Sequence, residues 1–280
     1  MSVMYSSRFI YFGAVVAFLA LLWISQPLLN AQQLSEESLH HRIMEASGFE
    51  HALSDIWLSI EQSIGQTNVS PSQRATLNEW LGGAFGGEGL TENFKERLRE
   101  HLDLHLGAEV IRFLDSDPGR IILETEAAQV HATEDELFDF SQSFEPGSRQ
   151  NRRRVELTRQ ILDGTRTLDN TVIILHSIYS NVMRAVHSVQ APEDRRMSEE
   201  DFAYTSGLIR TQLENQMSEY VMLNMLYTYR DIDISYLESY AAYLSSPAGL
   251  WYTETLHNIL QNVLVDSENR LKAAIDQYNG

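Results

Sequence analysis

Apolar residues recur every three or four positions through almost the whole chain after residue 34, and this is the spacing of one face of an α-helix. Segments that alternate apolar and polar residues one by one, rich in Val and Thr, are missing, so we predict no β-sheet. Ser70 before Pro71 and a capping box that opens at Thr133 mark helix starts. The sequence therefore predicts an all-α protein built as a helical bundle.

The most regular segment lies between residues 149 and 190. Its apolar residues recur every seven positions, and a second set falls between them at the four-three spacing of a coiled coil. The first set is Ile161, Leu168, Leu175, Val182 and Val189. We expect one continuous helix of roughly 60 Å here, at 1.5 Å per residue. Because this helix is too apolar to stand alone in water, we expect it to join and contact both halves of the chain, or to pack against a second copy.

A short motif occurs twice in the chain. Residues 113–119 read FLDSDPG with Glu124 downstream, and residues 243–249 read YLSSPAG with Glu254 at the same offset. This recurrence is typical of one helical unit used twice. In each copy we expect one helix to end, the chain to turn sharply, and a second helix to begin at a serine cap.

Five further residues define these predicted corners. Ser116 and Ser246 are the expected caps, and Gly119 and Gly249 fall in the opening turn of the second helix. Pro247 occupies the first helical position, where a missing N–H costs nothing. A glycine in a helix costs about 1 kcal/mol, so we expect these two glycines to allow a neighbouring helix to approach closely.

These signals divide the chain into four parts. Residues 1–31 are a signal peptide, 32–147 an N-terminal helical repeat, 148–190 a long connecting helix, and 198–280 a C-terminal helical repeat. Residues 32–280 are expected to form one structural unit.

The C-terminal copy also carries a family resemblance. Residues 237–249 read LESYAAYLSSPAG, an aromatic pair followed by Ser-Pro-x-Gly. This pattern resembles the core signature of a small helical domain of unknown function in exported proteobacterial proteins, over about residues 206–264. The first copy departs from it, with Asp117-Pro118 in place of Pro-Ala. The resemblance implies export and a helical fold, and it implies no activity, cofactor or catalytic residue.

The N-terminal segment predicts export. Arg8 precedes an apolar run over residues 9–24, Pro27 follows it, and Ala31 offers a small residue before a cleavage point. This is the layout of a secretory signal peptide. The alternative is an anchor that remains in the inner membrane through residues 9–24, although this run is shorter than the roughly 20 residues of a membrane-spanning helix. We expect a periplasmic protein.

Composition excludes several classes of function. The 280 residues include 21 Lys and Arg against 39 Asp and Glu, a net charge of −18, which repels nucleic acid and anionic lipid. The one basic cluster, residues 152–154, is interpreted as an exposed first helical turn. The absence of cysteine excludes disulfides and thiol catalysis. We find no catalytic constellation, so we expect neither enzymatic activity nor a cofactor.

Two weak candidates for site chemistry remain. His101 and His105 are four residues apart, so on one helix they would share a face and could bind a metal ion. Glu124 and Glu254 hold equivalent places in the two copies and could form a carboxylate pair if they faced each other. In both cases we favour a structural or solvated role for these side chains.

The C-terminal third concentrates residues suited to a binding surface. Nine of the twelve tyrosines follow residue 200. The partner- or ligand-binding candidates are Tyr236, Tyr240, Tyr243, Met217, Met222 and Met225. Tyrosine combines an apolar ring with a polar tip, and methionine adapts to irregular partners. We predict a module that binds another periplasmic protein or itself. The alternative is a carrier that holds a small lipid-like ligand between helices.

Overall fold

The computed structural model describes residues 35–128, 133–192 and 195–279. The predicted signal peptide, residues 1–31, lies outside the described residues. Within them the protein is all-α and has no strand, so the predicted fold class is confirmed. Among the described helices, none combines the length and the apolar character that a membrane span requires.

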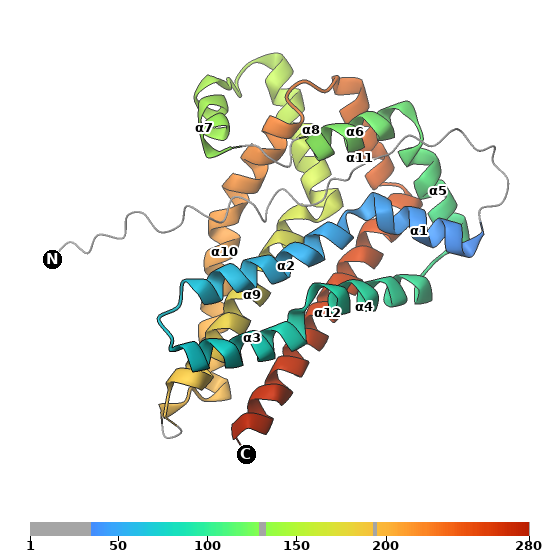
Figure 1. Ribbon diagram of the computed structural model, residues 1–280. Coiled ribbons are helices and arrows are strands. Elements are labelled where there is room, and N and C mark those ends of the chain that lie inside the picture. The colour runs from blue at the N-terminus through green and yellow to red at the C-terminus, as the bar shows by residue number, and fades with distance from the viewer. Residues whose placement is uncertain (1–34, 129–132, 193–194, 280) are drawn as a thin grey trace.

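The chain order of the helices divides them into two halves (Figure 1). The first half contains α1 (Glu36–Ser47), α2 (Phe49–Gly65), α3 (Pro71–Phe85), α4 (Gly87–Glu100), α5 (Leu104–Leu114), α6 (Asp117–Ala128) and α7 (Glu134–Ser143). The second half contains α8 (Arg149–Thr165), α9 (Thr167–Gln190), α10 (Glu199–Thr228), α11 (Ile234–Leu244) and α12 (Pro247–Asn279).

The two halves repeat the same plan helix by helix. The pair α1–α2 breaks at Gly48 and the pair α8–α9 at Arg166, each in the left-handed backbone region, with φ of 68° and 56°. The next stretch begins at a serine cap in both halves. In the first half it consists of α3 and α4, which are separated at Gly86, and in the second half it is the single helix α10. Then α5 and α11 each span 11 residues and begin at an aspartate cap. The repetition therefore covers most of the chain, well beyond the short motif.

Packing follows the same symmetry. α1 lies on α5 as α8 lies on α11, and α1 adjoins α2 as α8 adjoins α9. Between the halves, α5 packs on α12 and α6 packs on α11, which is the reciprocal arrangement expected about an approximate twofold axis. The symmetry is incomplete because α12 continues far beyond the length of α6 and also covers α3, α4 and α9 (Figure 1).

The prediction of one connecting helix over residues 148–190 is wrong. The left-handed residue Arg166 separates α8 from α9, and these two helices are the counterparts of α1 and α2 rather than a link between repeats. The heptad pattern runs through the break because both helices bury one face in the same core. On α9, Leu175, Ile178 and Val182 are buried against other helices of the same chain.

One residue of the basic cluster is buried, although its charge predicts exposure to solvent. Arg154 is only 5 % exposed, and its guanidinium donates a hydrogen bond to the carbonyl oxygen of Tyr229 at the end of α10. That carbonyl lies at the helix end and also accepts from the backbone N–H of Ile232 at 3.2 Å, so the arginine is its second partner. Burial lowers the pKa of Arg154 from its ordinary value. The interpretation of residues 152–154 as a fully exposed turn is therefore wrong at its third position.

Candidate functional site

The two repeated corners have nearly identical geometry. The amide of Gly119 donates to the hydroxyl oxygen of Ser116 (3.3 Å), and that of Gly249 donates to Ser246 (3.2 Å), so each serine caps the helix that follows. A Cβ atom on either glycine would lie 2.8 Å from the Cα of the last residue of the preceding helix, and closer still to a backbone carbonyl. The group that needs the glycine is thus the preceding helix of the same corner, and not a more distant one.

The corners meet each other through equivalent aromatic residues. Phe113 and Tyr243 hold the same position in the two copies, and their rings stack at 3.9 Å between centroids with an interplanar angle of 1°. Tyr240 continues the stack, 5.9 Å from Phe113. The approximate twofold axis therefore passes close to the Phe113–Tyr243 pair, and the two repeats face each other.

A carboxyl group lies beside this stack. Glu126 follows the buried Ile122 by four residues on α6, so its half-buried side chain lies on the inner face of that helix. The hydroxyl of Tyr229 donates to its Oε1 at 2.5 Å. Burial raises the pKa of Glu126 to about 7, and the hydrogen bond from Tyr229 opposes this increase only in part. Burial, with the nearby Glu126, likewise raises the pKa of Tyr240 and Tyr252.

The six tyrosines and methionines predicted to bind a partner or ligand are buried or half-buried in the fold. Tyr243 and Met225 are buried at 8 % exposure each, and Tyr240 lies half-buried in the aromatic stack. Tyr236, Met217 and Met222 are half-buried side chains packed on the core. Tyr240 and Tyr243 of α11 stack on Phe113 of the other repeat, so the contact between the repeats covers this tyrosine face.

The weaker candidates are separated by the fold. His101 ends α4 and His105 lies in the first turn of α5, so the two residues are not on one helix and the shared face is lost. The described residues contain no group of three or more His, Asp or Glu side chains that could hold a metal ion. Glu124 and Glu254 are both exposed, on α6 and α12. The carboxyl that enters the repeat interface is Glu126, two residues beyond the predicted one.

The outer face of α10 is exposed and carries no charge along one stripe. We call this set the α10 stripe; its members are Tyr204, Leu208, Thr211, Asn215 and Ser218. Tyr204 and Leu208 are 70 % and 54 % exposed, and the next three residues are also exposed. The spacing alternates four and three residues, as in a coiled-coil seam. α10 lies at the edge of the molecule in Figure 1 and packs against α8 and α9.

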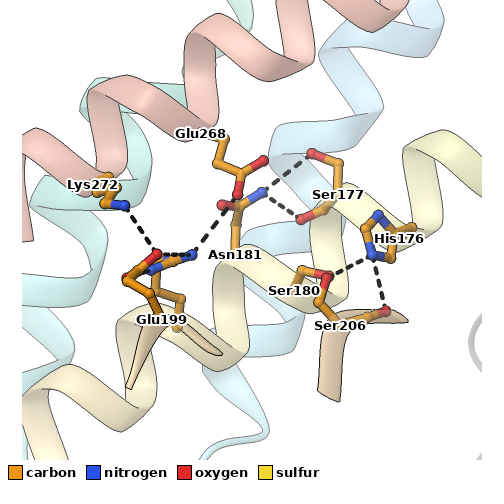
Figure 2. A network of polar contacts seen from close by, with 9 residues as sticks. His176, Ser177, Ser180, Asn181, Glu199, Ser206, Glu268 and Lys272 are labelled. Atoms are coloured by element: carbon orange, nitrogen blue, oxygen red, sulfur yellow. Dashed lines mark hydrogen bonds and ion pairs between the residues drawn. The ribbon is translucent and has the colours of Figure 1, made fainter. Parts of the chain in front are cut away.

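Behind the stripe, a buried polar network joins α9 to α10. Figure 2 shows His176, whose Nε2 lies 2.8 Å from the Ser206 hydroxyl and 3.1 Å from the Ser206 carbonyl oxygen. Ser180 lies 3.1 Å from the same hydroxyl, and the Asn181 amide donates to the carbonyl oxygen of Ser177. Burial lowers the pKa of His176. The network fixes the first half of α10 on α9 while its outer face stays free.

A second part of Figure 2 lies where α9, α10 and α12 meet. Arg184 of α9 donates to Glu199 at 2.6 Å and lies 3.9 Å from Glu268, while Lys272 donates to Glu199 at 2.9 Å. The Arg184 guanidinium also stacks on the ring of Phe202, 3.5 Å from its centroid. Only 11 % of the Arg184 side chain is exposed. Glu199, Glu268 and the ring of Phe202 together hold its guanidinium in place.

Comparison with known proteins adds no further assignment: no family model, curated protein or solved structure matches the chain. The resemblance of residues 206–264 to an exported domain of unknown function therefore stays a prediction.

Proposed function

We propose that this protein is a non-enzymatic, exported module that self-associates through the α10 stripe. The observation that carries the proposal is an exposed, uncharged stripe with heptad spacing on the surface of a strongly acidic chain. From Tyr204 to Ser218 it extends for about 21 Å at 1.5 Å per residue, which is long enough for a helix-to-helix contact.

A second copy of the chain suits this stripe better than an unlike partner does. A four-three seam can pack against an identical seam about a twofold axis, and twofold symmetry is the commonest symmetry of homodimers. Two chains that each carry a net charge of −18 repel one another over most of their surfaces. The stripe offers them a face without that cost, and small residues such as Thr211 and Ser218 allow close approach.

Sedimentation equilibrium of the exported chain, residues 32–280, tests this proposal with one charged substitution. We expect the wild type to form dimers, and Leu208→Glu to weaken dimerisation by at least about 30-fold, because two carboxylates would be buried in each dimer. Leu250→Glu is the matched control, since Leu250 is 46 % exposed at the start of α12, away from the stripe. Both variants should retain the helical circular-dichroism spectrum.

A wild type that stays monomeric at high micromolar concentration would overturn the proposal, as would equal dissociation of both variants. Native mass spectrometry of the same sample addresses the carrier alternative. A monomer heavier than the polypeptide by a few hundred daltons, releasing a hydrophobic compound on organic extraction, would support that alternative instead.

A further inference from the structure

A small pocket opens at the junction of α9, α10 and α12, at the opposite end of the molecule in Figure 1 from the repeated corners. Its volume is about 140 Å³. It is lined by Arg184, His187, Ser188, Arg196, Met197, Glu199, Phe202, Lys272, Ile275 and Asp276. The Tyr/Met candidates and the α10 stripe contribute none of these residues, so the pocket is separate from the proposed dimer face.

Two of the lining residues have buried hydrogen-bond donors without a partner. These donors are the Nε atoms of Arg184 and Arg196. The terminal nitrogens of Arg184 already contact Glu199 and Glu268, so its Nε–H is the part of the guanidinium left to bind something else. Buried donors in folded proteins are nearly always paired, and two unpaired donors on residues that line the same pocket indicate an acceptor that binds there.

The charge of the pocket also favours an anion. Its lining carries three cations, Arg184, Arg196 and Lys272, against two carboxylates, Glu199 and Asp276, which gives a net charge of +1. Glu268, which is outside the lining, lies 3.9 Å from Arg184 and makes the site as a whole neutral, whereas the whole chain carries −18. An anion in the pocket therefore avoids the net repulsion that the acidic chain exerts elsewhere.

His187 adds a further donor to this set. The backbone N–H of Met197 donates to Nδ1 of His187 at 3.4 Å, which leaves Nε2 as the nitrogen of this lining residue that can donate. The donors therefore come from the end of α9, from the segment before α10, and from α12. They do not lie along one edge, as the two parallel N–H groups that grip a carboxylate do.

From this arrangement we propose that the pocket binds a tetrahedral oxyanion, a phosphate group. A phosphate presents acceptor oxygens in several directions and can take hydrogen bonds from Arg184, Arg196 and Lys272 together, whereas the acceptors of a carboxylate lie in one plane. The bound group would connect α9 and α12 through the segment that leads into α10, and would hold the start of that helix.

Calorimetric titration of the exported chain with inorganic phosphate, at constant ionic strength set by sodium chloride, tests the site. We expect saturable binding, a rise in melting temperature with phosphate and not with chloride, and at least about a tenfold loss of affinity in Arg196→Gln. The matched control is Arg210→Gln, an exposed arginine that pairs with Glu214 on α10; its affinity should equal that of the wild type.

Glycerol phosphate, titrated in parallel, separates two sources of the same group. Binding tighter than that of inorganic phosphate would indicate that the group belongs to a larger molecule, and equal or weaker binding would indicate the free ion; both support the site. Failure of both compounds to bind at millimolar concentration would overturn the proposal. An equal loss of affinity in Arg196→Gln and Arg210→Gln would also overturn it, because that result describes general charge attraction.

Discussion

The buried carboxyl group of Glu126 makes stability depend on pH in a defined direction. Its pKa rises from 4.5 to about 7 on folding because the group is removed from water. Between these two values the folded protein keeps a proton that the unfolded chain has lost. Stability therefore falls as pH rises through this window, and the full penalty is present above pH 7.

The size of this effect follows from the pKa change. At 1.36 kcal/mol per pKa unit, the change corresponds to about 3 kcal/mol, and we treat this as an upper bound because the Glu126 side chain is half-buried. Glu126→Gln removes the ionisable proton but keeps an oxygen to accept the Tyr229 hydroxyl. We expect the variant to be more stable than the wild type by about 1–3 kcal/mol near pH 8, and to lie within about 1 kcal/mol of it near pH 5.

Urea unfolding followed by circular dichroism, at several pH values from 5 to 8, measures this difference. Glu124→Gln is the control: its side chain is exposed on the same helix, so the variant should follow the wild-type pH profile. A stability difference between Glu126→Gln and the wild type that is the same at both ends of the pH range would refute the reasoning.

Three further predictions follow from the packing. Gly249→Ala should destabilise the protein by at least about 3 kcal/mol in urea unfolding, because its Cβ would overlap the preceding helix, whereas Gly83→Ala in the open on α3 should be neutral or stabilising by up to about 1 kcal/mol. Tyr243→Phe removes a buried hydroxyl that has no hydrogen-bond partner, so the free energy of unfolding should stay the same or rise slightly. Tyr229→Phe removes the hydrogen bond to Glu126 and should lower the free energy of unfolding by about 1–2 kcal/mol at mildly acidic pH. The reverse order of stabilities would contradict the account. Burial lowers the pKa of His257, so stability should fall as pH drops below 6.5, and His257→Asn should flatten this limb of the pH profile.

Local features of the fold could be predicted from the sequence. The caps at Ser116 and Ser246, and the need for glycine three residues later, depend only on neighbours in the chain, so a short motif predicts them. The break at Arg166 could not be predicted in this way. It is a single left-handed residue within an apolar pattern that continues across it, and periodicity does not detect such a residue.

Residues that meet across the repeat interface were harder to predict. Glu126 and Tyr229 are 103 positions apart, and nothing local in the sequence pairs them. One signal was present, because Glu126 follows Ile122 by four residues on an apolar helix face. The tyrosines of α11 were assigned to an exposed surface because their spacing predicts a shared face, and spacing alone does not tell whether a partner chain or the other repeat covers that face.

The most direct test of the proposed self-association uses the absence of native cysteine. Single cysteines introduced as Thr211→Cys and Asn215→Cys, mixed and oxidised, report contact between the α10 helices of two chains. We predict efficient disulfide-linked dimers from this pair and none from Leu250→Cys under the same conditions. No cross-linking through α10, or equal cross-linking through Leu250→Cys, would contradict the account.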